Sequence, residues 1–179
     1  MQYLDYMGRK LGGESKTEEY SKEAKPASSR SENSGFPRWG NGDGWIKEAR
    51  IRDLAGNERD CFSTGEGICI EFDYVTEKPL DSPVVGIGIF RNDGVQCYGT
   101  NTQIEHFDAL SLKESGTIAF TVPKLALLPG EYFIDLALHR EDGFAYDYWR
   151  KALTFRVFSN LTEAGVARLE HTWDFRAKA

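Results

Sequence analysis

Residues 84–102 read VVGIGIFRNDGVQCYGTNT, and they are the most informative stretch of the chain. In its first half valine and isoleucine alternate with glycine, so one face of the predicted strand is apolar and the other has almost no side chains. A turn of Asn92, Asp93 and Gly94 follows, and then a second alternating run. The pattern predicts a β-hairpin with something packed flat against its bare face, because glycine otherwise weakens a strand.

Two turns fit this hairpin, and they place Tyr98 differently. In a three-residue loop with Gly94 in the left-handed conformation, Arg91 pairs with Val95 and Tyr98 falls opposite Gly88 on the bare face. A two-residue turn slips the register by one residue and sends Tyr98 into the core. We favour the three-residue loop, in which Tyr98 forms an aromatic shelf beside a floor of backbone, a surface suited to a sugar ring.

The rest of the chain after residue 39 consists of short alternating runs with turn signals roughly 8–12 residues apart, as in an all-β sandwich. In residues 131–140, Tyr132, Ile134, Leu136 and Leu138 are predicted to face the core. We expect an antiparallel β-sandwich of about eight strands in two sheets, since each strand has one apolar face to cover. Besides the hairpin, the runs are residues 45–54, 68–74, 118–122, 131–140 and 153–157, and residues 166–175 form a last extended segment.

The chain divides into three predicted regions, of which residues 38–179 form the sandwich. Residues 11–37 are predicted to be a flexible linker, because Gly, Ser, Lys and Glu dominate them and large apolar residues are almost absent. Residues 1–10, MQYLDYMGRK, carry tyrosine, leucine and methionine side chains. We expect this segment to be the remnant of an upstream domain.

Composition excludes several classes of protein. The 179 residues carry a formal net charge of -6, whereas a non-specific nucleic-acid binder uses clustered Lys and Arg to displace counterions. The sequence has no run of about 20 apolar residues and no apolar signal core. Its 3 cysteines lack CxxC spacing, which fits reduced thiols. We therefore expect a cytoplasmic protein with no nucleic-acid partner.

Sequence motifs for catalysis or for metal binding are missing. There is no GxSxG elbow, and residues 12–17 lack the Gly-Lys-Ser/Thr of a phosphate loop. The histidines His106, His139 and His171 do not pair at metal-ligand spacing. The sequence thus predicts no catalytic residue, no metal site and no bound cofactor.

Outward-facing aromatic and polar side chains provide a different kind of candidate site. Sugars bind such surfaces because their C–H faces stack on aromatic rings while their hydroxyls need polar partners. Residues 144–149, FAYDYW, add aromatic rings in an expected loop, and Arg91 or Arg156 suits an acidic end group. The competing interpretation is that these rings are covered by a loop or by a second subunit. The candidate carbohydrate-binding residues are Arg91, Gln96, Tyr98, Phe133, Asp135, His139 and Trp149.

Five short motifs occur in an order and at a spacing that resemble a known family. The chain is similar, over residues 38–175, to the C-terminal polysaccharide-binding domain of Wzt-type ATPase subunits, which belong to ABC transporters that export O-antigen polysaccharide. The motifs are RWGNGDGWI at residues 38–46, DLAG at 53–56, YGTNT at 98–102, LPGEY at 128–132 and EHTWD at 170–174.

The resemblance implies a β-sandwich of immunoglobulin-like or jelly-roll type that recognises the modified non-reducing end of an O-antigen polysaccharide. It also implies a homodimer with an exchanged terminal strand, for which residues 166–175 after a hinge at 159–165 are the candidate. Residues 1–10 would then be the remnant of the ATPase domain. The expected partners are that domain and a transmembrane transporter subunit, at the cytoplasmic face of the inner membrane.

Two rival functions remain open. The first is a dimerisation or docking sandwich without glycan binding, whose outer face would be covered by protein. The second is a glycan-processing enzyme, which needs two carboxylates roughly 5–10 Å apart across a groove. Asp135 with Glu131, or Asp135 with Asp147, are the pairs that deserve examination.

Overall fold

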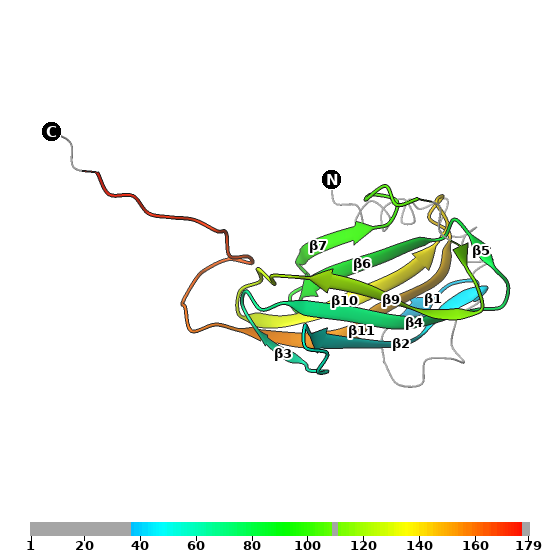
Figure 1. The fold of residues 1–179 in the computed structure, drawn as a ribbon, viewed down its shortest axis with the longest axis horizontal. Helices are drawn as coiled ribbons and strands as arrows, with labels where there is room; N and C mark the ends of the chain where they lie inside the picture. The colour runs from blue at the N-terminus through cyan, green and yellow to red at the C-terminus, as the bar shows by residue number, and fades with distance from the viewer. Residues whose placement is uncertain (1–36, 109–110, 177–179) are drawn as a thin grey trace.

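The computed structural model describes residues 37–108 and 111–176, and these residues form eleven strands in three sheets and no helix. The predicted all-β antiparallel sandwich is confirmed (Figure 1). Residues 1–10 and almost all of the predicted linker, residues 11–37, lie outside the described residues.

The larger sheet has six strands and carries the hairpin. Its order is β1-β11-β10-β6-β7, and β3 pairs in parallel with the far end of β11. The strands are β1 (Arg38–Trp39), β3 (Cys61–Ser63), β6 (Val84–Arg91), β7 (Gln96–Asn101), β10 (Gly130–His139) and β11 (Ala145–Phe158).

The smaller sheet has the order β2-β4-β9 and packs against the larger one (Figure 1). Its strands are β2 (Gly44–Asp53), β4 (Ile68–Thr76) and β9 (Ser115–Val122), and β5 (Leu80–Asp81) pairs with β8 (Ser111–Leu112) in a third sheet. The alternating runs of the sequence correspond to the long strands. Seven of the eight expected strands are formed, and the eighth, residues 166–175, is not. The other four strands, β1, β3, β5 and β8, have two or three residues each and are too short to show a period.

The core lies between the two sheets, as the alternation predicts. Ile134, Leu136 and Leu138 of β10 are fully buried and face Ile70 and Phe72 of β4 in one apolar cluster. Because these strands have period two, every second residue of β10 is directed to the opposite face of the larger sheet. That outer face is therefore defined by the same pattern that builds the core.

The hairpin turn is the predicted three-residue loop. The Arg91 amide donates to the Val95 carbonyl at 2.9 Å, and the Gly94 amide donates to the Arg91 carbonyl at 2.8 Å. Gly94 has a φ of 89°, which is in the left-handed region that glycine adopts without steric cost. This part of the hairpin prediction is confirmed.

The predicted position of Tyr98 is wrong. A register shift on β7 inserts one residue after the turn, so Tyr98 pairs with Ile89 and Gly99 falls opposite Gly88. The Tyr98 ring lies 6.5 Å from the Phe120 ring of the smaller sheet, and the residue is 48% exposed. Tyr98 therefore lies at the open side of the sandwich, and the predicted aromatic shelf beside Gly88 does not form.

The two C-terminal segments also differ from expectation. Residues 145–149 begin the long strand β11 rather than forming a loop, and Trp149 pairs with Leu136 and packs against the core. The expected strand over residues 166–175 is not formed within the chain. An isolated bridge joins Ala167 to Leu127, and the residues beyond it lead away from the sandwich (Figure 1).

A buried ion pair joins the two sheets. Arg38 of β1 donates from Nε to one carboxylate oxygen of Asp147 at 2.9 Å and from Nη2 to the other at 2.6 Å. The second oxygen also accepts the Ile46 amide of β2 at 2.7 Å, and Arg38 donates to the Ile46 carbonyl. The side chains of Arg38 and Asp147 are only 6% and 3% exposed.

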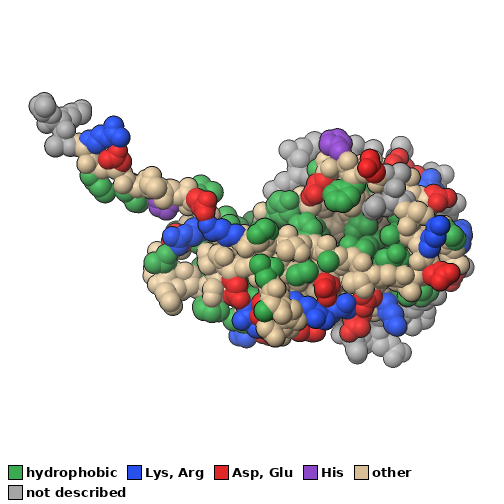
Figure 2. Space-filling view, viewed as in Figure 1, with side chains coloured by type: hydrophobic (Ala, Val, Ile, Leu, Met, Phe, Trp, Pro, Cys, Tyr) green, Lys and Arg blue, Asp and Glu red, His purple; other side chains and the backbone are tan. Residues whose placement is uncertain are grey.

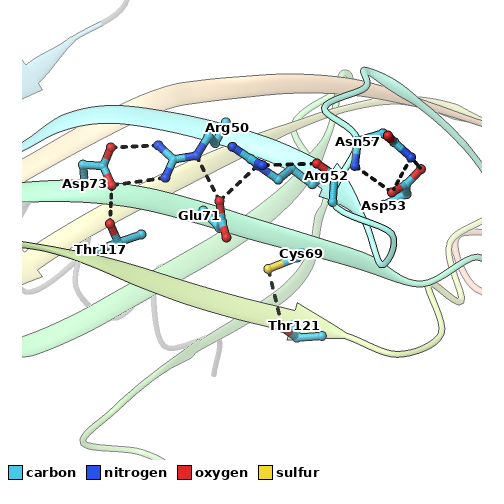
Figure 3. A network of polar contacts seen from close by, with 10 residues as sticks. Arg50, Arg52, Asp53, Asn57, Cys69, Glu71, Asp73, Thr117 and Thr121 are labelled. Atoms are coloured by element: carbon cyan, nitrogen blue, oxygen red, sulfur yellow. Dashed lines mark hydrogen bonds and ion pairs between the residues drawn. The ribbon is translucent and has the colours of Figure 1, made fainter.

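The outer face of the smaller sheet carries an ionic network (Figure 3). Arg50 binds the Asp73 carboxylate with both terminal nitrogens, at 2.8 and 3.2 Å, and Glu71 with Nε at 2.9 Å. Thr117 of β9 donates to Asp73 at 2.6 Å. The hydrogen bonds from Arg50 and then from Thr117 lower the pKa of Asp73 to about 2.

We expect Asp147→Ala to destabilise the domain by about 3–5 kcal/mol, because the Arg38 guanidinium then stays buried without its carboxylate. Urea unfolding followed by tryptophan fluorescence measures this loss. The double variant Arg38→Met/Asp147→Leu removes both charges and should recover much of it. An Asp147→Ala variant within about 1 kcal/mol of the wild type would contradict the prediction.

Arg50→Met should lower the Tm at pH 7, and this deficit should shrink as the pH falls from about 4 to about 2. The pKa of Asp73 is lowered in the folded state, so its stabilising contribution is present above the unfolded-state pKa and is lost as the pH falls through the folded-state pKa. Thermal unfolding across this pH range measures the deficit. Arg140→Met, which removes the partner of the exposed Asp142, is the control and should show little deficit at any pH.

Candidate functional site

The outer face of the larger sheet carries the candidate site. On β10, Phe133, Asp135, Ala137 and His139 point away from the core, as the alternation predicts. The strands β7, β6, β10 and β11 lie side by side in this sheet, so their outward residues share one face. Gly88 lies opposite Asp135, and Gly86 lies opposite Ala137, so the β6 side of this face is largely backbone.

Two pairs of stacked aromatic rings stand on this face. Phe133 stacks on Phe90 with ring centroids 5.1 Å apart and an interplanar angle of 7°. Trp39 stacks on Tyr148 at 4.4 Å and 11°. Both pairs join neighbouring strands, which orients their rings before any ligand arrives.

A hollow of about 350 Å³ lies beside the first pair, where β10 and β11 approach the hairpin turn. Lys151 reaches over the Phe133 ring, with Nζ 4.6 Å from the ring centroid. The rim carries charges of both signs and uncharged hydrogen-bonding groups. The lining residues are Asp60, Asn92, Glu131, Tyr132, Phe133, Lys151, Thr154, Phe155 and Arg156.

The polar groups of the rim hold one another loosely. Arg156 approaches the Asp60 carboxylate at 3.9 Å, and the side chains of both residues are mostly exposed. The side-chain amide nitrogen of Asn92 donates to the Glu131 carboxylate at 3.3 Å. Exposed ion pairs of this length contribute little to stability, so these side chains are available for a ligand at small cost.

Asp135 is only 4% exposed, and both of its carboxylate oxygens accept hydrogen bonds from the protein. One of its carboxylate oxygens accepts the Lys151 amide at 2.8 Å, and the other accepts the Tyr148 hydroxyl at 3.3 Å. Burial raises the pKa of Asp135, against the opposing effects of the Lys151 amide and the Arg150 charge. Burial and the Asp135 charge likewise raise the pKa of Tyr148.

His139 lies at the far end of the same face and is buried. Its Nδ1–H donates to the Arg140 carbonyl at 2.7 Å, and burial lowers the pKa of the imidazole. Asn101 lies beside it across Gly86, and its side-chain nitrogen is buried without a hydrogen-bond partner in the structure.

The two carboxylate pairs considered for glycan cleavage are separated by the fold. Asp147 pairs with the core residue Leu138 and binds Arg38 between the sheets, whereas Asp135 is on the outer face. Glu131 shares the outer face with Asp135, but four residues of extended strand put their Cα atoms about 13 Å apart. Over residues 37–108 and 111–176, no group of three metal-ligating side chains is present, and no helix is long and apolar enough to cross a membrane.

Comparison with known proteins identifies the family. The family model of the Wzt C-terminal domain matches residues 37–169. The chain belongs to the Wzt C-terminal domain family. The sequence resemblance is thereby confirmed, and the sandwich described above is that domain.

One curated relative and one solved structure illustrate the membership. The O-antigen export system ATP-binding protein RfbB of Myxococcus xanthus is 26% identical over 128 residues, which are 72% of this chain and 28% of the relative. This Wzt C-terminal domain thus spans under a third of the relative's length. A crystal structure of the C-terminal domain of wzt superposes with a TM-score of 0.73 at 21% identity, covering 80% of this chain and 90% of that chain, and it shares the fold.

The Wzt C-terminal domain brings together only part of the predicted site. Phe133, Asp135 and His139 share the outer face as predicted, and Gln96 joins them opposite Phe90. Of these four, only Phe133 lines the hollow.

Arg91 and Trp149, like Tyr98, lie elsewhere. Arg91 pairs with the core residue Tyr132 and ion-pairs with Asp93 in its own turn at 2.7 Å. The Trp149 ring lies under the Arg38 guanidinium, 4.4 Å from its central carbon. Tyr98 was assigned to the outer face because the extra residue on β7 was not foreseen, and Trp149 was assigned to a loop although it lies in β11. Arg91 continues the inward positions of β6 after Ile87 and Ile89.

Sequence reasoning missed the residues that an irregularity brings to the site. Lys151 belongs to a bulge of β11, and no periodic pattern places it over Phe133. Asn92 and Asp60 come from a turn and a loop. The one usable signal was the outward position of Thr154 and Arg156, which follows from their alternation with Leu153, Phe155 and Val157.

Proposed function

We propose that this Wzt C-terminal domain is a non-catalytic carbohydrate-binding module that recognises the modified non-reducing end of an O-antigen polysaccharide and couples it to export. The observation that carries the proposal is the hollow on the outer face, where aromatic rings lie beside uncharged hydrogen-bonding groups and beside acidic and basic side chains. The printed name of the relative from Myxococcus xanthus, an O-antigen export system ATP-binding protein, supports the export role.

The size and chemistry of the hollow favour recognition of a chain end. About 350 Å³ is near the lower limit of small-molecule sites, roughly 300–1,000 Å³, so it suits a single sugar residue with its substituent. Thr154 and Asn92 offer hydroxyl and amide groups for sugar hydroxyls, and Arg156 suits an acidic substituent. We expect modest affinity, because a partly open site exchanges water for protein at small net gain.

The test is binding of the purified O-polysaccharide from the bacterium that encodes the chain, with and without its end modification. Arg156→Ala should weaken binding of the modified glycan about tenfold or more and leave the Tm unchanged. Calorimetry measures the affinity. The matched control is Arg140→Ala, because the Arg140 side chain is 56% exposed against 61% for Arg156 and lies away from the hollow lining.

Three outcomes would contradict the glycan proposal. Equal affinity of the wild type for the polysaccharide with and without its end modification would reject the proposed recognition of the modified end. No binding of either glycan would favour the alternative, a dimerisation or docking sandwich without glycan binding. A shortened polysaccharide after incubation would contradict the non-catalytic role.

We further propose a homodimer with exchange of the C-terminal segment. Residues 166–168 pair with residues 126–128 through the bonds from the Leu128 amide to the Val166 carbonyl and from the Arg168 amide to the Ala126 carbonyl. Beyond them, Leu169, His171, Trp173 and Phe175 occupy every second position, and the three apolar side chains are exposed (Figure 2). Such an apolar strand face needs a partner sheet, and the outer edges of β7 and β9, the end strands in their sheet orders, can provide one.

Trp173→Ser/Phe175→Ser should convert a dimer into a monomer, because it removes the apolar face that a partner sheet would bury. Size-exclusion chromatography with light scattering measures the mass. Phe107→Ser, which removes an exposed aromatic ring from another part of the surface, is the control and should stay dimeric. A monomeric wild type, or a dimeric double variant, would contradict the proposal.

The remaining partners follow from the same family membership. We propose that the intact protein carries an upstream ATPase domain, of which residues 1–10 are the remnant and to which residues 11–37 are the linker, and that it binds a transmembrane transporter subunit. This arrangement would hold the sandwich at the cytoplasmic face of the inner membrane.

A further inference from the structure

We propose that Lys151 contacts the bound glycan end and that Asp135 is the positioning residue that holds it in place. This inference rests on the proposed glycan-binding function. Lys151 would donate hydrogen bonds from its ammonium group to an oxygen acceptor of the terminal sugar residue or of its substituent.

The bulge lies where β10 and β11 lose register. Ile134 pairs with Leu153 and Leu136 pairs with Trp149, so residues 150–152 stand opposite Asp135 alone. On its other side, Asp135 faces Gly88, which has no side chain. The carboxylate is directed toward β11, where it accepts the Lys151 amide at 2.8 Å.

Lys151 occupies the bulge in a conformation that lysine adopts rarely. Its φ is 50°, in the left-handed region where a β-carbon is unfavourable and where glycine or asparagine is the usual residue. Strain of this kind persists only where the surroundings determine it, and it concentrates at functional sites. Here the surroundings are the Asp135 carboxylate, buried and also bound by the Tyr148 hydroxyl. Ser82, His106 and Glu114 also have a left-handed φ, so what distinguishes Lys151 is that its side chain lines the hollow.

The side chain of Lys151 enters the hollow over Phe133. The ammonium nitrogen lies 4.6 Å from the ring centroid, and both residues line the hollow. Phe90 stacks on the same ring from the β6 side, whereas Lys151 approaches from the β11 side. Phe90 and Lys151 both contact the Phe133 ring, which leaves little of the ring for a sugar to stack on. A glycan end in the hollow would therefore meet the ammonium group of Lys151.

Asp135 acts in this arrangement through Lys151. The sequence pattern predicted it as a direct carbohydrate ligand, but both carboxylate oxygens are engaged by the protein and the residue does not line the hollow. A positioning role needs an oxygen acceptor for the Lys151 amide and does not need the negative charge. An asparagine supplies that oxygen, whereas an alanine does not.

The first test compares Lys151→Gly and Lys151→Asn with the wild type, using the purified, end-modified O-polysaccharide as the probe. Both replacements suit the left-handed backbone, so the Tm should stay equal or rise, while affinity should fall about tenfold or more. Glu114→Gly is the matched control, because Glu114 also has a left-handed φ, 53°, and a charged side chain, but lies in the turn before β9. Its affinity should not change.

The second test separates positioning from direct contact. Asp135→Asn should keep affinity within about threefold of the wild type, whereas Asp135→Ala should lose as much as Lys151→Gly. Equal losses in both Asp135 variants would overturn the positioning role. Wild-type affinity in both Lys151 variants would overturn the lysine contact while leaving the glycan-binding proposal intact. A wild type that does not bind the polysaccharide would instead reject the proposed function.

Discussion

The buried ion pair between Arg38 and Asp147 connects the two sheets of the sandwich. Burying two charges is unfavourable unless each is fully hydrogen-bonded, and here the carboxylate also accepts the Ile46 amide of the facing sheet. The pair thereby joins β1, β11 and β2. It also holds the two-residue strand β1, which is too short to be stable by its own ladder, against the larger sheet.

A series of direct contacts connects β1 to the candidate site. Trp39, the residue after Arg38, stacks on Tyr148, and the Tyr148 hydroxyl donates to Asp135. Asp135 accepts the amide of Lys151, whose side chain lies over Phe133 in the hollow. Each contact restricts the next side chain, so the outer face is ordered from the protein side before a ligand binds. Side chains held in this way lose less conformational entropy when a ligand binds.

The regular and irregular parts of the strands have different roles. The core positions of β4 and β10 follow strict alternation, and the sequence pattern located them because burial demands period two. Phe133, Asp135 and His139 were assigned to the outer face by the same alternation. Tyr98 was misplaced by one extra residue on β7, and Trp149 was misplaced because its segment, read as a loop, begins a strand. A bulge depends on how two strands match, which neither strand encodes alone.

The sequence by itself determined the all-β class, the three-residue turn at Gly94, the inward residues of the long strands and, through five short motifs, the family. These properties depend on local backbone preference and on period-two burial, which neighbouring residues specify. Only the tertiary structure decided which outward residues meet. The left-handed bulge at Lys151 and the hollow beside Phe133 depend on how β10 and β11 lose register and on which turn and loop residues pack beside them, and neither leaves a periodic signal in the chain.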